Sequence, residues 1–123
     1  MNIPDQLFYT SDHEWVKIDN DIATVGITDY AQNELGDIIF IEFPDIGSEW
    51  KVGDIIATIE AVKTVADIYS PIAGRVSDIN THLNDRAEFI NKDPYGAGWI
   101  IKFDLINKEN SSLLQPHEYQ QLI

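Results

Sequence analysis

The chain of 123 residues contains no cysteine. A protein without thiols forms no disulfide, no iron–sulfur cluster and no Cys-ligated zinc site, and it has no thiol nucleophile. Any thiol or redox chemistry carried out with this chain must therefore come from a prosthetic group.

Histidine is also scarce, and its spacing predicts no metal site. His13, His82 and His117 are far apart in the sequence, and none belongs to an HxxxH pattern. No nucleophile has a base beside it, and the Gly-x-Gly that begins at Gly96 lacks the third glycine of a dinucleotide-binding loop. We therefore predict neither catalytic residues nor a set of metal ligands.

Positively charged residues are also few. Only 8 lysines and arginines oppose 21 acidic residues, which gives a formal net charge of −13. A nucleic-acid-binding surface presents clustered Lys and Arg to phosphates, so this balance argues against nucleic acid as a partner. No apolar stretch approaches the ~20 residues of a membrane-spanning helix, and the first residues, MNIPDQLFYTSDHEW, resemble neither a secretory signal nor an Arg-rich presequence. We expect a monomeric cytoplasmic protein of bacterial type, with a mature mitochondrial matrix protein as the alternative.

The pattern that is present predicts one mainly β domain, residues 1–123. Turn signals separate short runs of alternating or β-branched residues, which is typical of a small sandwich or barrel-like sheet. The expected strands are Trp15 to Ile18, Ile22 to Ile27, Asp37 to Phe43, Arg75 to Ile79 and the alternating stretch Trp99 to Leu105.

Short helices are expected beside this sheet. Thr28 can cap a helix from Asp29 to Leu35, with Gly36 just past its end. The stretch Asn110-Ser111-Ser112 is expected to cap a C-terminal helical segment, about residues 110–122, that Pro116 breaks or kinks.

The centre of the sequence is the stretch from Ile55 to Val76, IIATIEAVKTVADIYSPIAGRV, with Lys63 near its middle and the nearest other cations, Lys51 and Arg75, each twelve residues away. β-branched residues on both sides predict two strands with Lys63 at or near the turn between them. No Gly, Asn or Pro lies beside Lys63, so the turn has no strong signal of its own. Taken alone, a lysine in such a turn is ordinary solvated charge.

The same stretch resembles the lipoyl-lysine segment of the glycine cleavage system H-protein family. The matching residues there are Glu60, Val62, Lys63, Asp67, Tyr69-Ser70-Pro71 and Gly74. The similarity continues in the family's order from about Tyr9 to Tyr119, through HEWV at 13–16, VGITDYA at 25–31, LGD at 35–37, DPYG at 93–96 and GW at 98–99. The chain departs from the family at Ala61, where Ser is usual, and at Thr64 and Val65, where small residues are usual.

The resemblance implies a carrier protein, not an enzyme, with the fold of a barrel-sandwich hybrid: a flattened lipoyl/biotinyl carrier-like barrel with short flanking helices. It implies lipoate bound through an amide to Lys63, placed there by lipoate-attaching enzymes. It further implies that the arm takes an aminomethyl group at the glycine decarboxylase (P-protein) and delivers it to the aminomethyltransferase (T-protein). Reoxidation would follow at dihydrolipoyl dehydrogenase (L-protein).

Other interpretations stay open at this point. A lipoyl domain of a 2-oxoacid dehydrogenase complex shares the lysine hairpin, but it usually has Asp where this chain has Val62, and a Pro/Ala-rich linker. A biotin carrier usually has Met on both sides of its lysine. A protein that relays lipoyl or octanoyl groups would look the same, and a small enzyme using Glu60 and Asp67 for acid–base chemistry would need a pocket.

Two acidic residues are candidate contacts of the loaded arm. The loaded terminus is a primary amine that is cationic near neutral pH, and a sheltered cation needs an opposing carboxylate. Asp67 lies close to Lys63 in the hairpin, and Glu14 lies in the His-Glu-Trp segment that matches the family. The alternative is that both carboxylates are solvated, as exposed acids usually are.

Overall fold

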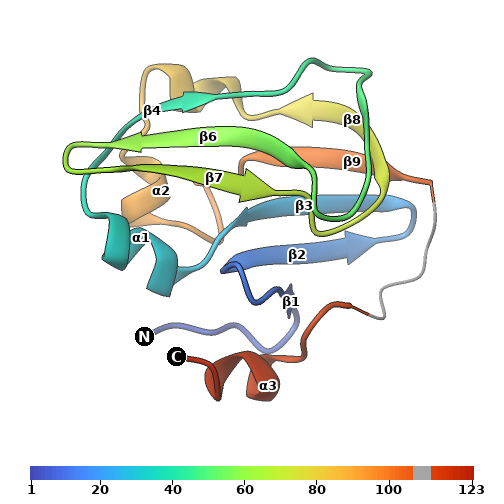
Figure 1. Ribbon diagram of the computed structural model, residues 1–123, viewed down its shortest axis with the longest axis horizontal. Coiled ribbons are helices and arrows are strands. Elements are labelled where there is room, and N and C mark those ends of the chain that lie inside the picture. Colours follow the sequence, from blue (N-terminus) through green and yellow to red (C-terminus); the bar gives the residue numbers. More distant parts are fainter. Residues whose placement is uncertain (107–111) are drawn as a thin grey trace.

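The computed structural model describes residues 1–106 and 112–123. In this part of the chain two antiparallel sheets lie over one another, and short helices flank them (Figure 1). The elements, in chain order, are β1 Phe8–Tyr9, β2 Glu14–Asp19, β3 Ile22–Ile27, α1 Asp29–Leu35, β4 Ile38–Glu42, β5 Glu49–Trp50, β6 Ile55–Ala61, β7 Val65–Tyr69, β8 Gly74–Ile79, η1 Thr81–Asn84, α2 Phe89–Lys92, β9 Ile101–Leu105 and α3 Pro116–Gln120.

The larger sheet has six strands in the order β1-β2-β3-β9-β8-β5, and the smaller sheet has three in the order β4-β6-β7. β2 and β3 form a hairpin, and β9 enters between β3 and β8. The two sheets and the short helices confirm the mainly β fold class expected from the sequence.

Most of the core lies between the two sheets. The buried side chains of the larger sheet include Val25, Phe103 and Val76, and they pack in one cluster with Ile59 and Ile68 of the smaller sheet. Burial of a large aliphatic or aromatic side chain stabilises a fold by roughly 1.5–3 kcal/mol, so this shared layer holds the sheets together.

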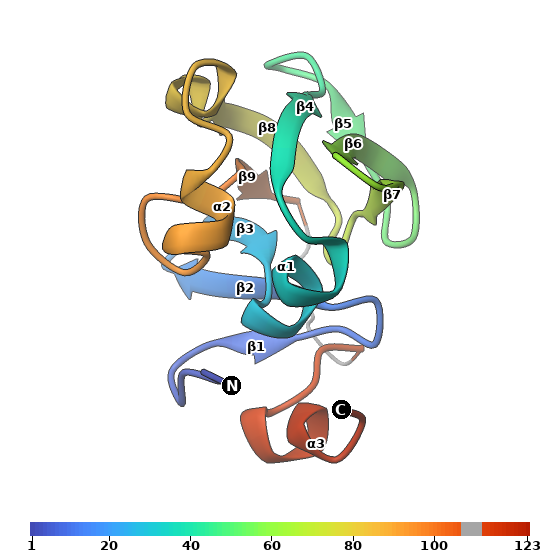
Figure 2. The same ribbon diagram turned by 90° about the vertical axis from the view of Figure 1, so that its left-hand side faces the viewer.

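A second, smaller cluster joins the two ends of the chain. Leu7, Tyr9 and Trp15 pack with Tyr119 of α3, and the rings of Tyr9 and Tyr119 stack with centroids 4.8 Å apart. Backbone hydrogen bonds between Tyr9 and Leu114 continue this contact. Figure 2 shows α3 lying below β1, close to the N-terminal segment.

Helix α1 forms where the sequence predicts it. The Thr28 side chain accepts a hydrogen bond from the backbone N–H of Ala31, and the N–H of Gly36 bonds to the carbonyl of Gln32 at the other end. Gly36 has φ +77°, a left-handed conformation that suits glycine at a helix C-terminus.

The C-terminal helix is shorter than expected. Residues 107–111, which include the expected cap residues Asn110 and Ser111, lie outside the described part of the chain. Among the described residues α3 begins at Pro116, and Gln115 and Glu118 form a capping box around its start. The prediction that Pro116 breaks or kinks the helix was wrong: Pro116 begins it, because proline has no N–H to lose at the first helical position and its φ already fits the helix.

Candidate functional site

Lys63 lies at the tip of the β6–β7 hairpin, as predicted. Its side chain is exposed, and among the described residues it makes no ion pair. The backbone on either side is fixed: Ala61 N–H donates to the Thr64 carbonyl (2.8 Å), and Val62 N–H donates to the Asp37 carbonyl (2.9 Å). The tip therefore presents a free amine on an ordered backbone.

The stem of Lys63 runs past the C-terminal end of α1. A Cβ built on Gly36 would lie 3.4 Å from Lys63 Cε and 3.8 Å from Nζ. Leu35, the residue before Gly36, lines a cavity beside α1. Lys63 does not line this cavity itself, but its stem passes the glycine that follows a lining residue.

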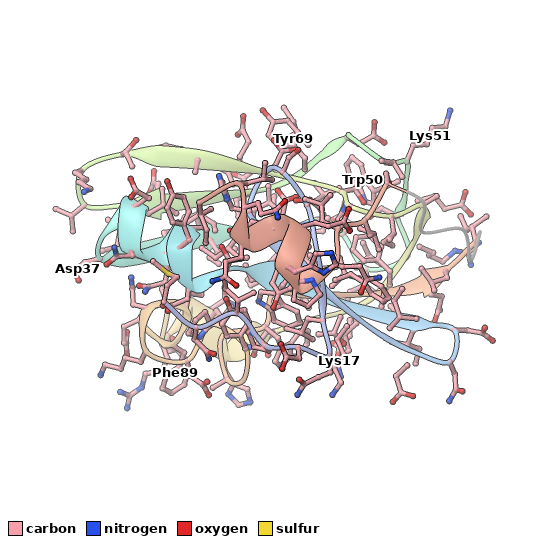
Figure 3. All side chains as sticks on the ribbon, turned by 90° about the horizontal axis from the view of Figure 1, so that it is seen from below. Lys17, Asp37, Trp50, Lys51, Tyr69 and Phe89 are labelled. Carbon is pink, nitrogen blue, oxygen red and sulfur yellow. The ribbon has the colours of Figure 1, made fainter. Side chains whose placement is uncertain are left out.

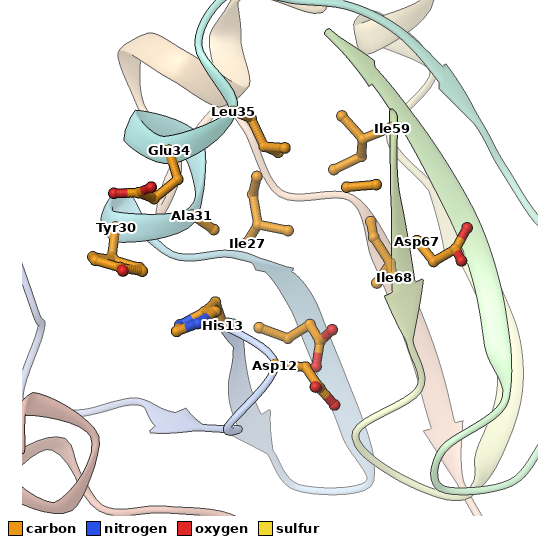
Figure 4. Close-up of a pocket in the computed structure, with 12 residues that line it drawn as sticks. Asp12, His13, Ile27, Tyr30, Ala31, Glu34, Leu35, Ile59, Asp67 and Ile68 are labelled. Atoms are coloured by element: carbon orange, nitrogen blue, oxygen red, sulfur yellow. The ribbon is translucent and has the colours of Figure 1, made fainter. Parts of the chain in front are cut away.

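The cavity has a volume of about 340 Å³ and lies between α1, the β6–β7 hairpin and the turn before β2 (Figure 4). Ile27, Leu35, Ile59 and Ile68 give it apolar walls. The titratable residues that line it are Asp12, His13, Glu14, Tyr30, Glu34 and Asp67, and neither Lys nor Arg is among its lining residues.

Glu14 is the buried acid of this cavity. Glu14 is only 2% exposed, and its carboxylate accepts hydrogen bonds from Thr10 Oγ1 (2.6 Å) and from the backbone N–H of Tyr69 (3.2 Å). Burial raises the pKa of Glu14 to about 7, although both hydrogen bonds oppose the shift. A carboxyl group with this pKa can hold a proton when the cavity is empty and a negative charge when a cation is present.

Asp67 contributes to the wall of the cavity, but its carboxylate faces the other way. In the β6–β7 register Ile59 pairs with Ala66 and Thr58 with Asp67, so Asp67 lies on the outer face of the small sheet. It is exposed, and Figure 4 shows its side chain directed away from Ile59 and Ile68. Glu60 is exposed on the same outer face, so the two acids of the hairpin do not meet in a pocket.

His13 lines the cavity next to Glu14 and has a left-handed backbone conformation, with φ +70°. Its Nδ1 lies 2.8 Å from the hydroxyl of Tyr119, and that hydroxyl lies 2.7 Å from Thr28 Oγ1. Burial lowers the pKa of His13, while the charges of Asp12 and Glu34 oppose the shift.

Sequence reasoning missed Thr10 and Tyr119 as residues of this site. Thr10 acts through its contact with Glu14, and Tyr119 reaches His13 from α3 across 106 positions of sequence. Neither residue belongs to a motif with known chemistry. Without the family resemblance, the sequence around Glu14 indicates only a polar residue at a strand edge. The sequence holds no local signal for these contacts.

The structure also bears on a metal-binding site and on a membrane-spanning helix. Within residues 1–106 and 112–123, no three His, Asp or Glu side chains are grouped so that they could hold a metal ion. None of the helices in these residues has the length and apolar character needed to cross a membrane.

Comparison with known proteins identifies the family. A family model for the glycine cleavage H-protein matches residues 7–123. The glycine cleavage system H protein of Herpetosiphon aurantiacus is 47% identical over 122 residues, which cover 99% of this chain and 94% of that protein. The corresponding protein of Rubrobacter xylanophilus is 50% identical over 117 residues, covering 95% of this chain and 91% of the relative.

A solved structure agrees with these matches. The crystal structure of a glycine cleavage system H protein from Mycobacterium marinum superposes with a TM-score of 0.91 at 34% identity, covering 97% of each chain. The chain therefore belongs to the glycine cleavage H-protein family, whose members are lipoyl carriers of the glycine cleavage system and not catalysts.

Proposed function

We propose that this chain carries its lipoyl group on Lys63 and shelters the loaded end of the arm in the cavity that ends at Glu14. The observation that carries the proposal is the position of Lys63, an exposed amine whose stem passes Gly36, the residue next to Leu35 of the cavity wall. The lysine is accessible to an attaching enzyme, and the cavity lies within reach of a long arm that starts there.

The residues present fit a covalent lipoyl group. A primary amine on a flexible stem can form an amide, and Lys63 projects from a backbone that hydrogen bonds hold in place. When bound, lipoate supplies a dithiolane that is reduced as it takes up an aminomethyl group, which is chemistry that a chain without cysteine lacks.

Glu14 is our candidate for the contact with the loaded end. The cargo amine is cationic near neutral pH, and Glu14 is a buried carboxylate with no cationic side chain beside it in the cavity. Thr10 and the Tyr69 N–H fix its orientation, so the carboxylate does not have to reorganise when a cation arrives. Asp67 is the weaker candidate, because its carboxylate lies on the outer face of the sheet.

The apolar walls serve the same purpose. A cavity lined by Ile27, Leu35, Ile59 and Ile68 keeps water away from an arm that lies in it, and a lower local dielectric strengthens the contact with Glu14. Shelter of this kind is what a carrier needs if its cargo is lost to water.

The partners we propose are glycine decarboxylase, the aminomethyltransferase, dihydrolipoyl dehydrogenase and a lipoate-attaching enzyme. Family membership supports them, and the net charge of −13 suits brief, salt-sensitive docking on basic surfaces. Tethering raises the concentration of the arm at whichever partner the body has docked on. We propose that the chain works as a monomer in the bacterial cytoplasm, for which its bacterial relatives are the support.

The test is the intact mass of the protein purified from its own source, followed by peptide mapping. We expect one lipoyl group on Lys63, and none in Lys63→Arg or Lys63→Ala. Lys63→Arg should fold normally, because the side chain is exposed, yet a guanidinium stays protonated and cannot be acylated.

Lys51→Arg is the matched control for this experiment. Lys51 is also exposed, and Figure 3 shows it projecting at the opposite end of the molecule from Asp37, whose carbonyl anchors the hairpin tip. This variant should be modified as fully as the wild type. Wild-type protein that is unmodified, or modified at another lysine, would contradict the proposal.

A further inference from the structure

His13 is held between two helices that come from distant parts of the sequence. Its ring lies 4.8 Å from the ring of Tyr30 in α1 and 5.7 Å from the ring of Tyr119 in α3, measured between centroids. Its carbonyl accepts a hydrogen bond from Thr28 N–H (3.0 Å), which supports the left-handed backbone at this residue. The imidazole is therefore fixed in orientation where it lines the cavity.

The contacts of Thr28 indicate which groups donate and which accept in the hydrogen bonds around this ring. Thr28 is fully buried, and its Oγ1 already accepts a hydrogen bond from Ala31 N–H (3.2 Å). The hydroxyl oxygen of Tyr119 lies 2.7 Å from Thr28 Oγ1. Because Thr28 Oγ1 already accepts one hydrogen bond, we infer that Thr28 donates to Tyr119 and that Tyr119 in turn donates to Nδ1 of His13 (2.8 Å).

This direction determines the charge of the imidazole. A nitrogen that accepts a hydrogen bond carries no proton, so His13 is neutral with its proton on Nε2. Protonation of Nδ1 would reverse the chain: His13 would donate to Tyr119, Tyr119 to Thr28, and the buried hydroxyl proton of Thr28 would lose its acceptor. A buried donor without a partner is costly, so the network opposes the charged form.

We propose that Tyr119 is a positioning residue that holds His13 neutral, so that no histidine charge competes with a cationic cargo for Glu14. The charges around His13 make this control necessary: Asp12, Glu14 and Glu34 line the same cavity, and the charges of Asp12 and Glu34 raise the pKa of the ring. An imidazolium here would pair with these acids and repel an incoming amine. The part of the proposal that concerns cargo rests on the function proposed above.

The first test needs neither lipoate nor partner enzymes. In ¹⁵N NMR spectra of the unmodified wild-type protein, we expect His13 Nδ1 to show the chemical shift of an unprotonated nitrogen and Nε2 that of a protonated one at neutral pH. Tyr119→Phe keeps the ring that stacks on Tyr9 but removes the hydroxyl. In this variant the ratio of charged to neutral His13 should rise about tenfold at a given pH, as expected for the loss of one hydrogen bond.

Tyr9→Phe is the matched control. It deletes the hydroxyl of an equally buried tyrosine in the same stack, and that hydroxyl donates to the Pro4 carbonyl (2.7 Å), away from His13. The titration of His13 should match the wild type in this variant. A proton on Nδ1 in the wild type, or identical titrations of His13 in wild type and Tyr119→Phe, would overturn the proposal.

The second test uses the loaded carrier without partner enzymes and follows the release of its cargo as formaldehyde. Tyr119→Phe should release cargo several-fold faster than wild type and Tyr9→Phe at mildly acidic pH, and at the same rate at pH 8, where His13 is neutral in all three. Equal release at both pH values would overturn the link between His13 and cargo. The function proposed for Glu14 fails on a different result, which is unchanged release in Glu14→Gln.

Discussion

The exposed hairpin tip and the buried wall of the cavity, called here the free end and the fixed end, are built in opposite ways. At the free end, Val62 is 72% exposed and Lys63 projects into solvent, while hydrogen bonds hold the backbone in place. At the fixed end, Glu14 is 2% exposed and accepts two hydrogen bonds, and His13 packs against rings of α1 and α3.

The contrast matches two different physical tasks. Attachment needs an amine that another enzyme can reach, and an exposed side chain on a short turn supplies it with little tertiary support. Holding a cationic cargo needs a carboxylate that is already oriented and shielded from water, because electrostatic contacts strengthen where the dielectric is low. In a single small domain the free end and the fixed end therefore belong to different elements, the β6–β7 turn and β2.

The largest expected effect is on cargo retention at the fixed end. Glu14→Gln keeps the shape of the side chain but removes the charge, so the loaded carrier should lose its cargo about tenfold to a hundredfold faster, as expected for a lost charge-assisted contact. The measurement is formaldehyde release from pre-loaded protein in the absence of the three partner enzymes.

Asp67→Asn is the control on the opposite face of the hairpin. Its carboxylate is exposed and directed away from the cavity, so release should change by less than about twofold, as is usual for a screened surface charge. Equal acceleration in both variants would show that the arm also crosses the outer face, and wild-type rates in both would show that neither acid holds it.

The second prediction concerns stability against pH. The pKa of Glu14 is raised from 4.5 to about 7 in the folded protein, so between these values the folded state binds more protons than the unfolded state. The contribution of Glu14 to the free energy of unfolding should therefore fall as pH rises from about 4.5 to about 7, by on the order of 3 kcal/mol, and should not change further above that.

Glu14→Gln removes the titrating group, so urea unfolding of both proteins at pH 4.5 and pH 8 isolates this term. The stability difference between the two proteins should change by roughly that amount over this range. A difference that is the same at both pH values would show that Glu14 titrates normally.

The third prediction concerns docking at the free end. Because the chain carries a net charge of −13, its dissociation constant for the decarboxylase should rise several-fold between low and physiological salt, where charges are screened beyond about 8–10 Å. Val62, Val65 and Phe40 offer exposed apolar surface near the tip. A dissociation constant that does not change with salt would indicate that these apolar contacts carry the docking.

The smallest expected effect is on folding at the tip. Val62→Ala should change the free energy of unfolding by less than about 0.5 kcal/mol, because the side chain is 72% exposed. Ile59→Ala, three residues earlier in the same hairpin, should cost about 2–5 kcal/mol, because Ile59 is 1% exposed and packs between the sheets. Similar costs for the two substitutions in urea unfolding would contradict the contrast between the ends.

The sequence predicted the features that depend on neighbouring residues. The cap at Thr28 and the glycine at Gly36 marked both ends of α1, and the β-branched runs around Lys63 marked the hairpin, because each signal acts within a few positions. The prediction that Lys63 is the attachment site came from the family resemblance, since a lone lysine in a turn carries no chemical signal.

Glu14 was named as a candidate from the sequence, but its burial and the role of Tyr119 were not, because both depend on contacts across the fold. Glu14 is buried because β7 and the turn at Thr10 close over it, and Tyr119 becomes a partner of His13 only when α3 packs on β1. Nothing within a few positions of Glu14 or Tyr119 reports these neighbours. The start of α3 was misplaced for a local reason: proline was treated as a helix breaker when it stands at the first position.

The topology also has a consequence for the order in which the protein folds. The β6–β7 hairpin closes over only Val62, Lys63 and Thr64, whereas β9 pairs with β3 across most of the chain, with Asp104 opposite Ile22. Contacts between distant positions form more slowly than local ones, because more chain entropy is lost before they gain any energy. We therefore expect pulse-labelled hydrogen exchange to show protection in β6 and β7 before β9, and simultaneous protection would contradict this order. In this order of folding, Lys63, the proposed attachment site, is exposed on its hairpin before the cavity around Glu14 has formed. A folding intermediate that stalls at this point would be open to acylation but unable to protect its cargo.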